Sequence, residues 1–206
     1  MSGFDLLASD GERLEARWDA PARPKRAVVL CHPHPQHGGT MHAPLLRWVT
    51  KVLGEQKAAV LRFNFRGVGT STGRWGGGEA ELSDVAAAVE AARAAYPNLS
   101  LGLAGWSFGA ATALRWMAHT KEALPYAGIA PASSQLTSDL PHQLPPARRR
   151  FILGDRDQFI SVENLRPYAE SVGAELVVVP GSDHFFYHRE RKVGELVAEV
   201  LAQGPE

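Results

Sequence analysis

The segment Gly105-Trp106-Ser107-Phe108-Gly109 has the most chemistry-specific spacing in the chain, because it reads Gly-x-Ser-x-Gly. Small and apolar residues precede it, and a helix-like run follows it. A serine on a tight strand-to-helix turn needs an unusual backbone conformation, and larger residues two positions away would collide with the neighbouring strand and helix. The pattern predicts that Ser107 is a nucleophile. The first amides of the helix would then point to where the oxyanion of the attacked carbonyl forms. A chance match in an ordinary turn is the alternative interpretation.

A nucleophilic serine requires a base, and His184 is the best candidate. It lies in the loop after residues 176–179, an apolar run that predicts the last buried strand. A loop in this place can reach across the strand ends to Ser107. His188 is the rival, but it lies four residues later, within or near the final helix. A histidine that only caps that helix is the non-catalytic alternative for His184.

The base in turn needs an acid, for which the order serine, acid, histidine favours Asp157. Asp157 follows the predicted strand 151–153 in the pattern Gly-x-x-Asp. Asp155 is an alternative, because it lies two residues nearer the strand end. Asp183 is disfavoured, since a residue adjacent to the histidine seldom reaches its Nδ1 atom. A turn or helix-cap role is the bland interpretation of each aspartate.

The oxyanion hole is expected to use two backbone amides, those of Phe108 and His34. Phe108 directly follows the nucleophile, and His34 lies in the loop after the apolar run 27–32. In that loop Pro33 and Pro35 have no N–H to donate, whereas His34 keeps its own.

Four histidines gather in the same stretch, namely His32, His34, His37 and His42. A metal site is one interpretation. Their spacing matches no zinc pattern, and no nearby carboxylates or thiolates complete a ligand shell. We therefore expect a polar wall of the active-site crevice and no metal.

Two further features favour structural or binding roles. Residues 66–71 are glycine-rich but lack the ending of a P-loop, so a supporting turn is expected. Aromatic residues near the motifs either line an apolar acyl pocket or pack in the core: Trp75, Trp106, Phe108, Phe159, Phe185 and Phe186.

The elements that must position these residues alternate between strands and helices from residue 27 onwards. Expected strands cover residues 4–8, 13–18, 27–32, 58–63, 99–104, 126–130, 151–153 and 176–179; expected helices run from about 40 or 42 to 54, and over 79–96, 110–117, 163–172 and 190–201. This order predicts a single α/β domain over residues 1–206, with a mostly parallel, twisted sheet of about seven to eight strands and helices on both faces. All the candidate loops follow strand carboxyl ends and can converge on one crevice. Only residues 131–147 separate the weak expected strand 126–130 from the strand that precedes Asp157, and this stretch is too short for a lid domain.

The composition is that of an ordinary globular protein, with 206 residues and 45% hydrophobic residues. Lys plus Arg and Asp plus Glu each number 22, so no global field favours nucleic acid or an anionic membrane as a partner. The short basic run 148–150 is expected to be a solvated strand entrance. Cys31 is the single cysteine and is expected to be a buried, inert thiol. Neither a signal peptide nor 18 consecutive apolar residues occur, so a cytoplasmic location is expected.

With these motifs in hand, the chain resembles the α/β-hydrolase superfamily, in its small, lid-poor, dienelactone-hydrolase-like bacterial branch. The matching segments are residues 32–35 and 38–41, 62–71, 105–109, 154–157 and 183–184. The resemblance implies a serine hydrolase with the triad Ser107, Asp157 and His184, and without metal or organic cofactor. Dienelactone hydrolase proper uses a cysteine nucleophile where this chain has Ser107, which argues against dienelactone as the substrate.

We therefore expect hydrolysis of carboxylic esters with small or medium acyl groups through an acyl-enzyme on Ser107. The expected partner is a small-molecule ester, and the protein is expected to be a monomer or a dimer. A thioesterase or small-peptide hydrolase with the same triad is the alternative. A catalytically silent binding member of the fold is a further one.

Overall fold

A computed structural model describes residues 3–202 and contains one eight-stranded sheet in the order β1-β2-β4-β3-β5-β6-β7-β8. The strands are β1 (Phe4–Leu7), β2 (Arg13–Asp19), β3 (Arg26–Cys31), β4 (Ala58–Phe63), β5 (Ser100–Trp106), β6 (Tyr126–Ile129), β7 (Arg149–Gly154) and β8 (Ala174–Val179). Strands β1 and β2 pair antiparallel with each other, and β2 pairs antiparallel with β4. All other pairs are parallel. The predicted α/β class with a mostly parallel sheet is confirmed.

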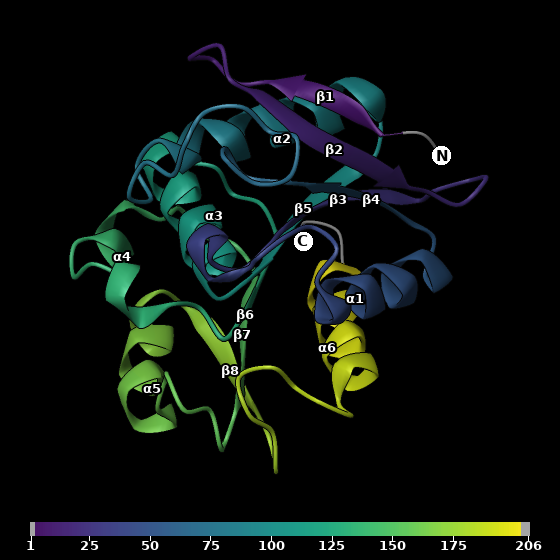
Figure 1. Cartoon of the computed structure of the whole chain (residues 1–206). Coiled ribbons are helices and arrows are strands. Elements are labelled where there is room, and N and C mark those ends of the chain that lie inside the picture. Colours follow the sequence, from purple (N-terminus) through teal and green to yellow (C-terminus); the bar gives the residue numbers. More distant parts are fainter. Residues whose placement is uncertain (1–2, 203–206) are drawn as a thin grey trace.

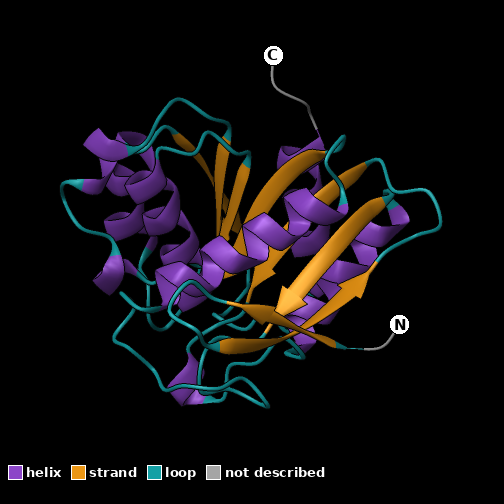
Figure 2. Ribbon diagram, turned by 90° about the horizontal axis from the view of Figure 1, so that it is seen from above, coloured by secondary structure: helices purple, strands orange, loops and turns teal. Residues whose placement is uncertain are grey.

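Helices cover both faces of this sheet. The longer ones are α1 (Pro44–Glu55), α2 (Glu81–Ala95), α3 (Phe108–Thr120), α5 (Val162–Ser171) and α6 (Glu190–Ala202). Helices α1 and α6 lie together on one face, and α2, α3 and α5 lie on the other (Figure 1). Figure 2 shows the same layers from above, with the twisted strands between the helices.

The central strands are apolar because helices bury them on both faces. Every residue of β4 is buried, as are the last five residues of β3 and of β5. The helices contribute the matching apolar side chains, such as Val85, Val89 and Ala92 of α2, which are buried. Cys31 lies within this core, as expected.

The structure corrects one helix boundary. Helix α1 begins at Pro44 instead of near residue 40 or 42, because proline fixes the backbone of the first helical turn and lacks the N–H that a preceding turn would need. The preceding residues form the short 3₁₀ turn η1 (Pro35–His37) and a further turn. The loop after β3 therefore contains no α-helical residues before Pro44.

The segment between β6 and β7 contains only two short elements, η2 (Ser133–Gln135) and α4 (Leu140–Gln143). They are too small for a lid domain, which confirms the expectation of a lid-less fold.

The expected solvated strand entrance at residues 148–150 is wrong for Arg149. This side chain is 6% exposed, and its Nη1 atom donates to the Val172 carbonyl at 3.0 Å. A second guanidinium nitrogen donates to the Pro145 carbonyl. Arg149 is tolerated inside because backbone oxygens accept hydrogen bonds from both of its terminal guanidinium nitrogens.

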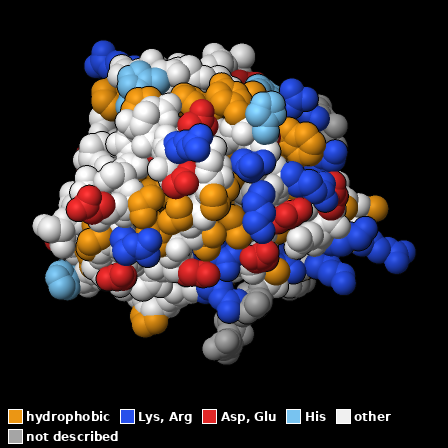
Figure 3. All heavy atoms as spheres, turned by 90° about the horizontal axis from the view of Figure 1, so that it is seen from below, with side chains coloured by type: hydrophobic (Ala, Val, Ile, Leu, Met, Phe, Trp, Pro, Cys, Tyr) orange, Lys and Arg blue, Asp and Glu red, His pale blue; other side chains and the backbone are white. Residues whose placement is uncertain are grey.

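The face drawn in Figure 3 has acidic and basic side chains interspersed around apolar ones, with Lys and Arg more numerous toward the right of the view. This distribution agrees with the balanced formal charge. Within residues 3–202, no helix has the length and apolar character needed to cross a membrane.

Candidate active site

Ser107 lies on the turn between the end of β5 and the start of α3. Its backbone has φ 52° and ψ −114°, a conformation that non-glycine residues rarely adopt. A Cβ atom at Gly105 would lie 2.6 Å from atoms of Gly109 and Ala110 in α3. A Cβ atom at Gly109 would lie 2.3 Å from the His32 carbonyl oxygen. The two flanking glycines are therefore required by close packing of the helix and the neighbouring strand, as the sequence pattern predicts.

His184 and Asp157 meet side by side in the loops that follow β8 and β7. The distance from His184 Nδ1 to Asp157 Oδ2 is 2.7 Å. The Asp157 side chain is fully buried, and its Oδ1 atom accepts hydrogen bonds of 2.9 Å from the amides of Phe159 and Ile160. The carboxylate is thus held by the backbone through one oxygen and faces the imidazole with the other. This contact leaves Nε2 as the ring nitrogen available to another group.

The rival residues have different surroundings. Asp155 Oδ1 accepts from the Gly181 amide at 2.7 Å, so this carboxylate holds the loop that contains His184. Asp183 Oδ1 accepts from the Phe185 amide at 3.0 Å. His188 is exposed and has a positive φ of 64°. Among the three candidate acids, Asp157 is therefore the one whose carboxylate contacts His184 Nδ1. The rival base His188 does not line the cavity that contains Ser107.

Ser107 and His184 line one cavity of about 680 Å³ at the carboxyl ends of the strands. Trp106, Phe108, Phe159 and Phe185 also line it, and the remaining wall is built from the loop after β3 and residues 132–134. The wall contains no Asp, Glu, Lys or Arg among the residues that the structure describes.

Two of the six candidate aromatic residues do not line this cavity. Phe186 is fully buried in the core. Trp75 is half-buried, has its ring 5.3 Å from that of His34, and lines a different pocket beside Arg66. The acyl-pocket interpretation is therefore wrong for both residues, because neither belongs to the wall of the cavity that contains Ser107.

The amides proposed for the oxyanion hole lie at this cavity. His34 and Phe108 both line it, and their rings are 5.1 Å apart. Neither amide donates to an acceptor among residues 3–202. Unpaired backbone donors at a cavity wall are suited to bind a developing negative charge.

The expected place in the polar wall of the crevice is wrong for His32, which is fully buried and does not line the cavity. Its side chain is buried, its Nδ1 lies 2.6 Å from the Pro33 carbonyl oxygen, and its Nε2 accepts from the Phe65 amide at 3.0 Å. Burial lowers the pKa of His32 to about 4, so the ring is neutral near pH 7 and Nδ1 is its donor. His32 thereby ties the loop after β3 to the loop after β4. Its place at the end of an apolar strand was the only sequence signal.

The other histidines of the cluster are also accounted for. His34, His37 and His42 line the cavity, which agrees with the expected polar wall. The rings of His34 and His37 stack with centroids 4.4 Å apart. In the described part of the chain no group of three or more His, Cys, Asp or Glu side chains is placed to hold a metal ion.

The glycine-rich loop after β4 is held by a buried ion pair. Arg66 Nη2 lies 2.6 Å from Asp84 Oδ1, and Arg66 Nη1 lies 2.7 Å from Asp10 Oδ2. At the start of the same loop, the Phe65 ring packs edge-on against Phe108 at 5.3 Å. The loop is thus a turn that supports the residue after Ser107, as expected.

An eight-stranded, mostly parallel sheet with a serine on a strained strand-to-helix turn defines the α/β-hydrolase class. Residues 22–164, more than half of the chain, match the family model described as "Serine aminopeptidase, S33". The chain belongs to this family of serine hydrolases within the α/β-hydrolase superfamily.

Solved structures of similar proteins agree with this assignment. The chain is 30% identical to XC6422 of Xanthomonas campestris, described as an α/β serine hydrolase without lid, with a TM-score of 0.87 over 99% of this chain and 96% of that one. It is 28% identical to an α/β serine hydrolase homologue from Coxiella burnetii, with a TM-score of 0.83 and 97% of each chain covered. An uncharacterized protein of Rickettsia prowazekii, RP471, is 28% identical over 200 residues, which are 92% of this chain and 84% of that protein.

Proposed function

We propose that this serine hydrolase cleaves carboxylic esters of small or medium acyl groups through an acyl-enzyme on Ser107. Asp157 and His184 complete the triad, and the amides of His34 and Phe108 form the oxyanion hole. The proposal is supported by the 2.7 Å contact between Asp157 and His184 and by the shared cavity of His184 and Ser107.

In the acylation step, His184 Nε2 accepts the proton of the Ser107 hydroxyl as Oγ attacks the acyl carbon. The carbonyl electrons move to oxygen, and the amides of His34 and Phe108 donate to the resulting oxyanion. The tetrahedral species then collapses, the bond to the alcohol oxygen breaks, and the imidazolium returns its proton to the leaving alcohol. Asp157 stabilises the imidazolium and orients the ring.

In the deacylation step, water takes the place of the alcohol. His184 accepts a proton from the water, whose oxygen attacks the acyl carbon of the ester on Ser107. Collapse releases the carboxylic acid and returns the proton to Ser107 Oγ. Because residues 131–147 form no lid, water reaches the acyl-enzyme directly.

The observation that carries the choice of substrate is the chemistry of the cavity wall. Trp106, Phe159 and Phe185 offer apolar contacts, and the described wall has no charged Asp, Glu, Lys or Arg. Such a wall suits an uncharged acyl or alcohol group.

Peptide hydrolysis is the second candidate, because the matching family model is described as a serine aminopeptidase. An aminopeptidase must bind a protonated α-amine, for which a carboxylate near the nucleophile is the strongest partner. The described cavity wall has no carboxylate, so the wall favours the ester over the peptide.

A substrate panel tests the proposal. It compares p-nitrophenyl esters of increasing acyl length with an acyl thioester and with aminoacyl p-nitroanilides, using the wild type and Ser107→Ala. We expect ester hydrolysis in the wild type only, with Ser107→Ala folded and reduced in kcat by roughly three orders of magnitude or more. Retained activity in that variant contradicts the nucleophile, and faster cleavage of the anilides contradicts the ester preference.

A further inference from the structure

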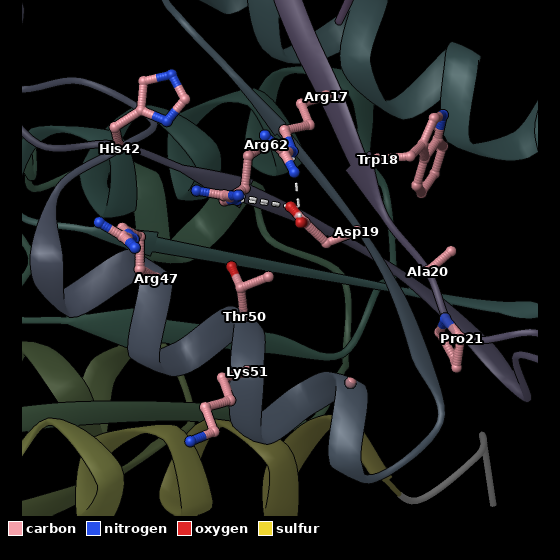
Figure 4. A pocket seen from close by; sticks show the side chains of 11 residues that line it. Arg17, Trp18, Asp19, Ala20, Pro21, His42, Arg47, Thr50, Lys51 and Arg62 are labelled. Carbon is pink, nitrogen blue, oxygen red and sulfur yellow. Dashed lines mark hydrogen bonds and ion pairs between the residues drawn. The ribbon is translucent and has the colours of Figure 1, made fainter. Parts of the chain in front are cut away.

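A second cavity, of about 710 Å³, lies between α1 and the end of β2, outside the wall that contains Ser107 (Figure 4). Its lining includes Arg17 and Asp19 of β2, Arg62 of β4, and Arg47, Thr50 and Lys51 of α1. Figure 4 shows Arg47 and Thr50 on the helix facing the side chains of Arg62 and Asp19 on the strands. This size is within the range of small-molecule sites, which are roughly 300–1,000 Å³.

The charge of this cavity is one-sided. Arg62 and Asp19 form a close ion pair, with 2.6 Å between Nη2 and Oδ2, so their charges cancel. Arg17 adds a weaker contact with the same carboxylate, at 3.5 Å. Arg47 and Lys51 have no carboxylate within ion-pair distance among residues 3–202. One carboxylate therefore faces the guanidinium groups of three arginines, and the Lys51 ammonium lies at the rim, 4.8 Å from the centre of the Trp48 ring. This leaves an excess of positive charge in a concave site.

A buried donor in the cavity wall lacks a hydrogen-bond partner in the described structure. Thr50 is 7% exposed, and its buried hydroxyl has no partner although threonine in a helix can use a preceding carbonyl. Arg17 Nε is also buried, but it is the atom that lies 3.5 Å from Asp19 Oδ1. Buried donors without partners are rare in native proteins, so the Thr50 hydroxyl at this cavity points to an acceptor supplied from outside.

We propose that this cavity binds a phosphate-bearing small molecule. A phosphate group supplies three acceptor oxygens and close to two negative charges, which match several converging donors and the excess of cations. Guanidinium groups such as that of Arg47 bind phosphate through two parallel N–H donors. The Arg62–Asp19 pair holds the floor of the site, since Arg62 Nη1 also donates to the Met41 carbonyl at 2.7 Å.

The site lies next to the catalytic cavity but is separate from it. His42 lines both cavities, and α1 begins at the catalytic wall with Pro44 before it presents Arg47 and Lys51 to the second cavity. Binding of phosphate here does not depend on Ser107, so it can be tested without any esterase assay.

Titration calorimetry with inorganic pyrophosphate at low ionic strength tests the proposal. We expect the wild type and Ser107→Ala to bind pyrophosphate at one site with equal affinity. The double variant Arg47→Ala/Lys51→Ala removes two exposed cations and is expected to weaken binding about tenfold or more. Arg166→Ala removes an exposed arginine of α5 outside the cavity and is the matched control, with unchanged affinity expected.

Three binding results would overturn parts of this proposal. Absence of pyrophosphate binding, or equal affinity in the double variant and the wild type, overturns the site. Tighter binding of citrate than of pyrophosphate at the same ionic strength overturns the choice of phosphate over carboxylate. Loss of binding in Ser107→Ala overturns the separation from the catalytic cavity.

Discussion

Asp157 and His184 are 27 positions apart in the chain, and the Oδ2 atom of the first lies 2.7 Å from the Nδ1 atom of the second. Their loops meet because β7 and β8 pair in parallel, so that the two carboxyl ends adjoin. Asp155, two residues before Asp157, uses its carboxylate on the backbone of the neighbouring loop instead. Two aspartates in one turn thus have different partners.

These different contacts predict that two matched substitutions will lower kcat to very different extents. Asp157→Asn removes the negative charge beside His184, and we expect kcat for p-nitrophenyl esters to fall about a hundredfold or more. Asp155→Asn keeps a hydrogen-bond acceptor for the Gly181 amide, so we expect kcat within about threefold of the wild type. A greater fall in kcat in Asp155→Asn than in Asp157→Asn would contradict the assignment of Asp157 as the acid.

The aromatic wall predicts a specific effect on substrate binding. Phe159 is 67% exposed, lines the catalytic cavity, and has its ring 5.0 Å from that of His184. Phe159→Ala removes apolar contact area, and we expect KM for longer acyl esters to rise about threefold to tenfold. Tyr187 is similarly exposed, at 63%, but does not line the cavity, so Tyr187→Ala serves as the control. Equal KM values for the two variants would remove Phe159 from the binding surface.

His32 predicts a pH dependence of stability. Burial lowers its pKa to about 4 in the folded state, below the ordinary value of 6.5. The unfolded chain therefore binds more protons between these two values, and the contribution of His32 to stability is lost as pH falls from about 6.5 to 4. The difference in pKa between the folded and unfolded states corresponds to a decrease in the free energy of unfolding on the order of 3 kcal/mol over this pH interval.

Urea unfolding of the wild type and His32→Gln at pH 4.5 and pH 7 measures this contribution. Glutamine cannot titrate, so the variant is expected to be less stable at pH 7 but to lose less stability on acidification. An identical pH dependence in both proteins would contradict the buried neutral imidazole.

The ion pair below the glycine-rich loop predicts a large loss of stability. Arg66 and Asp84 have side chains that are 6% and 0% exposed, and burial raises the pKa of Asp84 even beside the guanidinium. Arg66→Met leaves that carboxyl buried without its partner, and we expect the free energy of unfolding to fall by about 3–5 kcal/mol.

The exposed pair of Arg93 and Glu122 provides the control for this substitution. Arg93 is 48% exposed, so Arg93→Ala is expected to cost at most about 1 kcal/mol in the same urea titration. Similar decreases in the free energy of unfolding for Arg66→Met and Arg93→Ala would contradict the prediction that the buried pair contributes more to stability than the exposed pair.

The local sequence determined the features that depend on neighbouring residues. The Gly-x-Ser-x-Gly turn requires small residues at Gly105 and Gly109, and continuous apolar runs such as β4 require burial on both faces. The order of strands and helices then placed the loops of Ser107, Asp157 and His184 at one edge of the sheet, since parallel strands align their carboxyl ends.

Tertiary structure decided what depends on the direction of side chains from distant loops. The sequence favoured Asp157 but left Asp155 open as the acid, because a difference of two residues in a turn is resolved only by the hydrogen bonds of the neighbouring loop. Local patterns also failed to exclude Phe186 from the cavity wall. The cationic cavity was not predicted at all, because Arg17 and Arg47 lie 30 positions apart and reach one cavity only when α1 packs against β4, the neighbour of β2 in the sheet.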